Sequence, residues 1–280
     1  MRKIMNGNKL AKEDILYEDD SIAVCRKQAG IATQTARLGE LDLESALKNY
    51  WKASYVAVVH RLDQPVEGVL VFARTTESAA RLSRQSAGQI MNKKYYAVVM
   101  ADASMEAGKE NTLVDYLRKR GKENISEVVD KNTKDAKRAE LVYEVVAVKE
   151  ILLENGNNIG IAGGHVTANK LYNGIPSDKM WPGAVERDAG FRKQIALLRI
   201  QLKTGRHHQI RVQMAHGGMP LLGDGKYGSM ESKGYSHRMG IKNIALCAYG
   251  LEFVHPVTGE KMNFEITPEG EAFTHFPVNS

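Results

Sequence analysis

The sequence of 280 residues has little cysteine and no long apolar run, and both absences narrow what the protein can be. With only Cys25 and Cys247, it has no disulfide framework and no Cys-rich zinc site. No apolar run approaches the roughly 18–20 residues that a membrane-spanning helix requires. No apolar stretch follows the basic residues after Met1, as a secretion signal would require. We therefore expect a cytoplasmic protein that does not enter a membrane.

The composition is that of a globular protein with a modest cationic excess. Hydrophobic residues make up 43% and charged residues 26% of the chain, which excludes wholesale disorder. The chain carries 39 Lys and Arg against 33 Asp and Glu, a net charge of +6. Such an excess is compatible with a nucleic-acid partner but does not establish one.

The hydrophobic pattern predicts more strands than helices, and the two do not alternate strictly. Helices are expected over 41–50, 77–87 (with Thr76 as N-cap and Gly88 after its end) and 209–215. Strands are expected over 15–18, 22–25, 56–59, 69–72, 93–100, 141–148, 195–202, 244–253 and 262–266. This order favours the α+β class with a mixed, mostly antiparallel sheet. We expect one domain over 13–280 after an N-terminal tail over 1–12, with an insertion at about 155–190.

The segment over 118–138 is dense in charges of both signs. A solvated excursion is the interpretation that we favour, because runs of mixed charge are usually exposed. An RNA-facing arm has the same composition, so the sequence leaves that alternative open.

Three segments place polar side chains beside strands with a buried pattern. Residues 60–63 form a charged loop between two apolar strands, so Asp63 is expected to be held rigidly, and a structural Arg–Asp pair is the alternative. The strand that starts at 93 must send Tyr95 and Tyr96 to opposite faces. Residues 204–211 crowd donors at a helix start, which suits phosphate. A weaker alternative is a metal site built from His60, Asp63, His207, His208 and His216.

Together these segments resemble the motifs of the RluA-type pseudouridine synthase family. HRLD at 60–63 with GVLVFART at 68–75 is similar to the signature HRLDxxTSGLLVFAKT, and KKYYA at 93–97 is similar to KxYxA. TGRHHQIR at 204–211 matches TGRxHQIR, and PLLGDGKYG at 220–228 matches PLxGDxxYG. LCA at 246–248 and HPVTG at 255–259 resemble the ending LHA…HPxTG. The motifs follow the family's order from about residue 15 to 266, which is far more specific than any one of them.

The resemblance implies a pseudouridine synthase fold with a catalytic cleft across the sheet, and an enzyme that isomerises uridine in ribosomal or transfer RNA. By the same resemblance Asp63 is the catalytic carboxylate, Arg211 pairs with it, and Tyr95 stacks on the flipped base and helps to remove its carbon 5 proton. The residues implied in RNA binding are His60, Arg61, Lys93, Arg206, His208, Gln209 and Ile210, with Arg61 filling the space that the flipped base vacates. We expect no cofactor and no metal, and a monomer with RNA as its partner.

The chain also departs from the family pattern. Val66 and Glu67 replace the usual Thr-Ser, which is expected to put a carboxylate close to Asp63. Gln213 and Cys247 replace histidines of two other motifs. The altered first motif leaves open the alternative of a catalytically silent RNA-binding or RNA-folding protein on the same scaffold.

Overall fold

The computed structural model describes residues 12–35, 40, 42–102, 105–121, 123–153, 159–161, 191–276 and 278. The expected tail over 1–12, except its last residue, and most of the expected insertion at 155–190 therefore lie outside the described residues. None of the helices within the described ranges is long and apolar enough to cross a bilayer.

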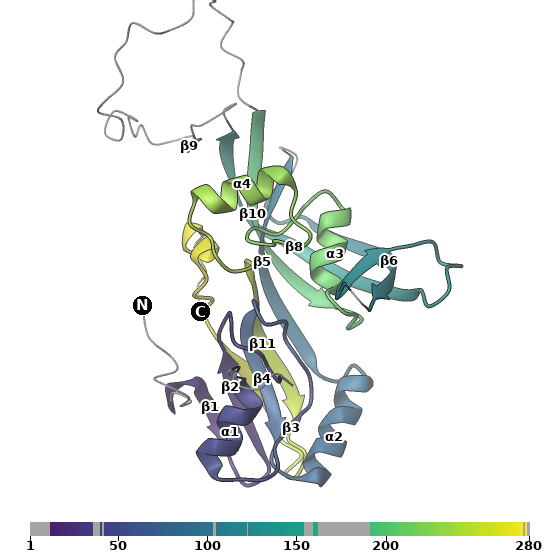
Figure 1. Ribbon diagram of the computed structural model, residues 1–280, viewed down its shortest axis with the longest axis vertical. Coiled ribbons are helices and arrows are strands. Elements are labelled where there is room, and N and C mark those ends of the chain that lie inside the picture. Colours follow the sequence, from purple (N-terminus) through teal and green to yellow (C-terminus); the bar gives the residue numbers. More distant parts are fainter. Residues whose placement is uncertain are drawn as a thin grey trace, which may run out of the picture.

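The described residues form one twelve-stranded sheet (Figure 1). Its strands run in the order β1-β2-β4-β11-β5-β10-β8-β6-β7, with β12 on β11, β3 on β4 and β9 on β8. The pairing of β11 with β4 is parallel, and the other pairings within the described part of the chain are antiparallel. The predicted α+β class with a mixed, mostly antiparallel sheet is confirmed. The strands are β1 (Ile15–Glu18), β2 (Ile22–Lys27), β3 (Ala57–Val58), β4 (Glu67–Ala73), β5 (Asn92–Asp102), β6 (Glu110–Arg120), β7 (Ile125–Val128), β8 (Lys137–Leu153), β9 (Ile159–Ile161), β10 (Phe191–Leu202), β11 (Leu246–Val254) and β12 (Lys261–Glu265).

Local capping signals mark the ends of several of the helices. The helices are α1 (Leu43–Trp51), α2 (Thr76–Ala87), α3 (Gln209–His216) and α4 (Met230–Arg238), with short 3-10 turns η1 (Lys12–Asp14) and η2 (Glu271–His275). The N-cap of α2 is Thr75 and not Thr76, because the Thr75 side chain accepts a hydrogen bond from the backbone N–H of Ser78. Gly217 ends α3, as its sequence predicts. The pattern gave no signal for α4, whose buried face includes Tyr235.

The alternation of β5 divides the core between the two faces of the sheet. Tyr95, Ala97 and Val99 pack on the face that α3 covers. Tyr96 lies in the cluster on the other face, with Tyr235 of α4. The prediction that the two tyrosines point in opposite directions is therefore confirmed, and it is Tyr95 that faces α3.

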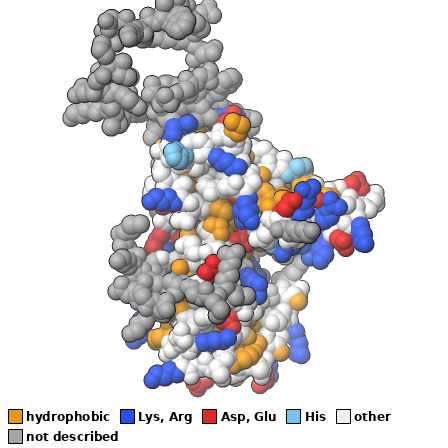
Figure 2. Space-filling model, in the orientation of Figure 1, with side chains coloured by type: hydrophobic (Ala, Val, Ile, Leu, Met, Phe, Trp, Pro, Cys, Tyr) orange, Lys and Arg blue, Asp and Glu red, His pale blue; other side chains and the backbone are white. Residues whose placement is uncertain are grey.

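The charge-dense segment is largely exposed, as its composition predicts, and it is also part of the sheet, which the pattern did not predict. It forms the β6–β7 hairpin and the start of β8, and its charges pair across strands, as Arg118 does with Glu127 at 2.5 Å. Figure 2 shows Lys and Arg interspersed with Asp and Glu over this arm. Strand edges and solvated loops share the same local charge pattern, so only the pairing distinguishes them.

Candidate active site

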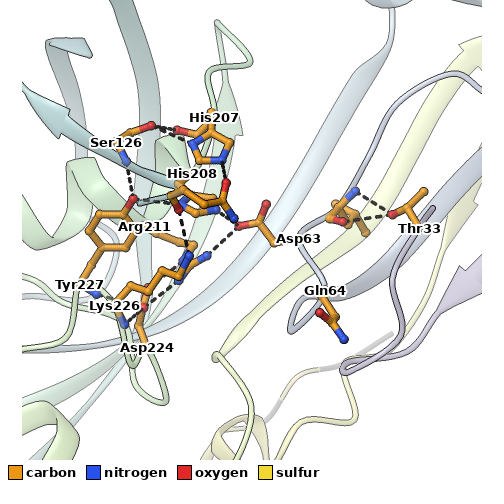
Figure 3. Close-up of polar contacts among 12 residues, drawn as sticks. Thr33, Asp63, Gln64, Ser126, His207, His208, Arg211, Asp224, Lys226 and Tyr227 are labelled. Atoms are coloured by element: carbon orange, nitrogen blue, oxygen red, sulfur yellow. Dashed lines mark hydrogen bonds and ion pairs between the residues drawn. The ribbon is translucent and has the colours of Figure 1, made fainter. Parts of the chain in front are cut away.

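Asp63 lies in the loop between β3 and β4, and contacts on both sides of it hold this loop in place (Figure 3). Before Asp63, the Thr33 hydroxyl donates to the carbonyl of Leu62 at 3.0 Å and accepts from its N–H at 3.2 Å. After Asp63, the Lys27 ammonium donates to the carbonyl of Gln64 at 3.0 Å. The rigid placement predicted for Asp63 follows from these contacts.

Lys27 is a residue of this site that the sequence analysis missed. It is 1% exposed, and its ammonium also donates to the carbonyls of Gln28 and Ile31. Burial lowers the pKa of Lys27 to about 7, against the opposing charge of Asp63. A lysine that ends a strand whose first four residues are apolar is the signal that could have found it.

Arg211 joins Asp63 to a second carboxylate. Its Nη1 donates to Asp63 Oδ2 at 2.8 Å, while Nε and Nη2 donate to the two oxygens of Asp224 at 2.8 and 2.9 Å. Burial by itself raises the pKa of Asp224, but the hydrogen bonds and charge of Arg211 outweigh it and lower that pKa below its ordinary value. The predicted pair of Asp63 and Arg211 is present, held by a partner that the sequence analysis did not place in the site.

Tyr95 completes a small cavity in front of Asp63. The cavity is about 90 Å³ and is lined by Asp63, Tyr95 and Arg211, by the apolar side chains of Leu62, Val66, Leu202, Ile210 and Leu246, and by Arg61, Arg206, His208 and Gln209. Burial, and then the charge of Asp63, raise the pKa of the Tyr95 phenol, so it is neutral at physiological pH. A half-buried carboxylate, a fixed guanidinium and a neutral phenol thus face one apolar cavity.

His208 is the first residue before α3, in a left-handed conformation with φ of 54°. Its Nε2 lies 3.4 Å from Asp63 Oδ2, and its Nδ1 lies 2.8 Å from the hydroxyl of Tyr227. Burial is the main cause that lowers the pKa of His208 to about 4. The negative charge of Asp63 opposes this shift, and the positive charge of Arg211 adds to it. His208 is therefore neutral at physiological pH, and both of its ring nitrogens already have protein partners.

Besides His208 and Ile210, three predicted RNA-binding residues line the cavity in different ways. Arg61 and Arg206 lie at its exposed rim, where Arg61 hydrogen-bonds Gln34 and Arg206 donates to the carbonyl of Arg138 at 3.0 Å. Gln209 is buried and serves the backbone: its Oε1 accepts from the N–H of Arg206 at 2.9 Å, and its Nε2 donates to the carbonyl of Glu140 at 3.0 Å.

His60 and Lys93, which the resemblance also implies in RNA binding, do not line the cavity. The Nε2 of His60 accepts from the backbone N–H of Val71 at 3.5 Å, and the ammonium of Lys93 lies 3.5 Å from the hydroxyl of Ser86 in α2. Burial lowers the pKa of both side chains. They lie toward α2, beyond the part of β5 that carries Tyr95.

The histidines considered for a metal site are dispersed. His207 and His208 stack with ring centroids 3.8 Å apart, but His216 pairs with Asp115 at 3.1 Å and His60 lies against β4. Across the described ranges no group of three or more His, Cys, Asp and Glu side chains is arranged to hold a metal ion. The arrangement gives no support to the metal alternative.

Glu67 does not face Asp63, contrary to the expectation from the sequence. Its carboxylate accepts from the backbone N–H of Glu269 and Gly270, at 3.1 and 3.0 Å, and lies 3.7 Å from Arg26. Because Glu67 begins β4, where side chains alternate between faces, its carboxylate is directed to the C-terminal segment on the other side of the sheet.

Comparisons with known proteins agree on one family. A family model described as RNA pseudouridylate synthase matches residues 21–216. The tRNA pseudouridine synthase C of Vibrio cholerae is 26% identical over 252 residues, which cover 89% of this chain and 88% of that protein. The ribosomal large subunit pseudouridine synthase D of Xanthomonas campestris is 31% identical over 88% of this chain and 63% of that protein. The solved structure of human RNA pseudouridylate synthase domain containing 1 superposes with a TM-score of 0.60 at 19% identity, over 91% of this chain and 83% of that one.

Proposed function

Since this chain belongs to the RNA pseudouridylate synthase family and is an isomerase that acts on RNA, we propose that Asp63 is its catalytic carboxylate, with Arg211 and Tyr95 as partners. The observation that carries the proposal is the convergence of these three residues, from three distant motifs, on one cavity. Within it, the Asp63 carboxylate lies 2.8 Å from the Arg211 guanidinium. A catalytically silent RNA-binding protein would need none of this arrangement.

The reaction detaches uracil from ribose at nitrogen 1, rotates it and rejoins it through carbon 5. An ionised carboxylate can start this either by covalent attack or by abstraction of a sugar proton. Arg211 supports both routes because it stabilises the ionised form of Asp63 and leaves one side of that carboxylate open to the cavity. The nucleotide gains and loses no atom overall, because carbon 5 loses one proton at the end and nitrogen 1 gains one.

Tyr95 is proposed to stack on the flipped uracil and to take part in removing the carbon 5 proton, with the Asp63 carboxylate in the same cavity as the acceptor of that proton. Its ring is buried against Ile210, beside Asp63. A neutral phenol at this position gives the base an aromatic surface without adding a second negative charge next to the carboxylate.

The proposed substrate is a uridine in transfer RNA or ribosomal RNA, the two classes that the names of the relatives indicate. A base inside folded RNA must be extruded to reach the cavity, at a cost of a few kcal/mol for unstacking. Arg61 and Arg206 at the rim are placed to contact phosphates, and Arg61 to fill the vacated space. We further propose that the protein acts in the cytoplasm as a monomer, since RNA is the one partner that these features require.

The test is the variant Asp63→Asn, assayed by tritium release from RNA that carries uracil labelled at carbon 5. We expect turnover to fall roughly 10⁴-fold, the scale of loss for a catalytic carboxylate, with little change in RNA binding. Asp20→Asn, in the exposed turn between β1 and β2, is the matched control and should retain wild-type turnover. Near-normal turnover of Asp63→Asn would refute the assignment, and wild-type protein that binds RNA but releases no tritium would favour the silent alternative.

A further inference from the structure

Tyr227 has no part in the proposed chemistry, yet it connects the β6–β7 hairpin to Asp63 (Figure 3). The backbone N–H of Ser126, in β7, donates to the Tyr227 hydroxyl at 2.7 Å. That hydroxyl lies 2.8 Å from His208 Nδ1, and His208 Nε2 lies 3.4 Å from Asp63 Oδ2. The four groups form one continuous chain from the hairpin to the carboxylate.

The direction of the protons along this chain follows from the donor at its start. A backbone N–H can only donate, so the Tyr227 oxygen accepts from Ser126. Within the described part of the chain, His208 Nδ1 is the acceptor within reach of the Tyr227 O–H. A neutral imidazole carries one proton, and if Nδ1 accepts, that proton is on Nε2 and points at Asp63.

The opposite tautomer is disfavoured by its hydrogen bonds. With the proton on Nδ1, the Tyr227 oxygen would accept twice and its own O–H would lose its acceptor. The unprotonated Nε2 would also direct its lone pair at the Asp63 carboxylate. Both penalties arise in a nearly buried setting, where the His208 side chain is 5% exposed.

In a second His–Asp pair of the same molecule, backbone donors determine the histidine tautomer without an intervening hydroxyl. The Nδ1 of His255 accepts directly from the backbone N–H of Val257 and Thr258, at 3.3 and 3.0 Å, and its Nε2 lies 2.9 Å from Asp19. There, backbone donors set the tautomer without an intermediate. In the site, the donor of Ser126 acts through the Tyr227 hydroxyl.

We propose that Tyr227, oriented by the backbone of Ser126, is a positioning residue that fixes His208 as the Nε2–H tautomer and so provides Asp63 with a second N–H donor beside Arg211. This inference rests on the proposed function only for the consequence on turnover. It assigns a role to the charged hairpin, which reaches Asp63 through two hydrogen bonds and the 3.4 Å contact between His208 Nε2 and the carboxylate.

The test is nitrogen-15 NMR of histidine-labelled full-length protein, wild type and Tyr227→Phe, near neutral pH. Protonated and unprotonated ring nitrogens have distinct shifts, and we expect wild-type His208 to be protonated on Nε2 alone. In Tyr227→Phe we expect the Nδ1–H form to appear, with kcat for RNA reduced about 10-fold and KM changed less than twofold, the scale of a lost supporting hydrogen bond. The resonances of His255 serve as the internal reference and should be the same in both proteins.

Ser126→Ala is the matched control, because it removes the hydroxyl that contacts His207 and keeps the N–H that Tyr227 accepts. It should retain the wild-type tautomer of His208. A wild-type His208 protonated on Nδ1, or a tautomer unchanged in Tyr227→Phe, would overturn the inference. The wild-type spectrum decides even if a variant does not fold, and because it does not depend on turnover, it separates this inference from the assignment of Asp63.

Discussion

Arg211 lies between two carboxylates in contrasting surroundings. On its closed side, the Asp224 side chain is 0% exposed and accepts from two nitrogens of Arg211 and from the backbone N–H of Lys226 and Tyr227. On its open side, the Asp63 side chain is 30% exposed and accepts from one nitrogen of Arg211, at 2.8 Å. The same guanidinium is thus anchored by one acid and presented to the other.

The contrast shows how Arg211 can be held rigidly by one carboxylate and still donate a hydrogen bond to the other. The two parallel hydrogen bonds to Asp224 fix the plane of the guanidinium, and this acid is balanced by enough donors to remain charged despite its burial. The remaining Nη1 is then directed at Asp63 without any need for Asp63 to hold it. Asp63 therefore keeps lone pairs free toward the cavity, as its proposed role as the catalytic carboxylate requires.

The strongest test of this contrast is Arg211→Ala, which removes the group that the two regions share. We expect turnover to fall on the order of 10²–10³-fold, the scale for loss of a preorganised donor at a reacting centre. The free energy of unfolding should fall by about 3–5 kcal/mol, because Asp224 is left buried without its partner. Tritium release and urea unfolding measure the two effects.

Arg211→Lys separates charge from geometry in the same assay. Lysine keeps the positive charge but lacks the planar fork that spans both carboxylates. Activity restored to within twofold of wild type would show that charge alone suffices and would contradict the importance of the bidentate anchor.

A smaller effect is expected from Asp224→Asn, which alters the closed side alone. The amide keeps an acceptor for the backbone N–H of Tyr227 but loses the charge that balances Arg211. We expect a loss of about 3 kcal/mol in stability and a 10- to 100-fold loss in turnover, since Arg211 would no longer be fixed. Wild-type turnover in this variant would mean that Asp63 alone orients the guanidinium.

The acid dependence of stability gives this prediction a second readout. Because the pKa of Asp224 is lowered from 3.8, its contribution to stability is complete above that pH and is lost as the pH falls through the lower folded-state pKa. The difference in unfolding free energy between wild type and Asp224→Asn should therefore shrink below about pH 4. A constant difference down to pH 2 would argue against an ionised Asp224.

Much of the fold was predictable because its signals are local. The alternation in β5 placed Tyr95 and Tyr96 on opposite faces, and the apolar run of β4 marked a strand buried on both sides. The β6–β7 hairpin was not predictable, because its stability comes from cross-strand pairs such as Arg118 with Glu127, and a solvated loop has the same composition.

The site was predictable where the motifs name the residues, and not where contacts distant in the sequence decide. Asp63 and Arg211 were paired through the family resemblance, but the contacts of Lys27 and Tyr227 depend on which distant segments of the chain lie side by side. The position of Lys93 also depends on such contacts. It shares a face of β5 with Tyr95 but lies two residues before it, where its ammonium contacts α2 and does not line the cavity.

The smallest expected effect comes from Glu67→Gln. This variant tests whether a carboxylate affects turnover because it contacts Arg211 or because it lies close to Asp63 in the sequence. Glu67 is four residues from Asp63, but its carboxylate is bound by the N–H groups of Glu269 and Gly270. Burial raises the pKa of Glu67 against these donors, so removing its charge also removes a cost of desolvation.

For Glu67→Gln we accordingly expect a loss of only about 1 kcal/mol in stability and less than a twofold change in kcat and KM. Urea unfolding and tritium release on the same preparation measure both quantities. This result would mean that Glu67 stabilises the C-terminal segment and does not affect turnover. Only the two acids that contact Arg211 would then matter to turnover. A tenfold loss of turnover at unchanged stability would extend the catalytic centre through β4 to the other face of the sheet and would break that contrast.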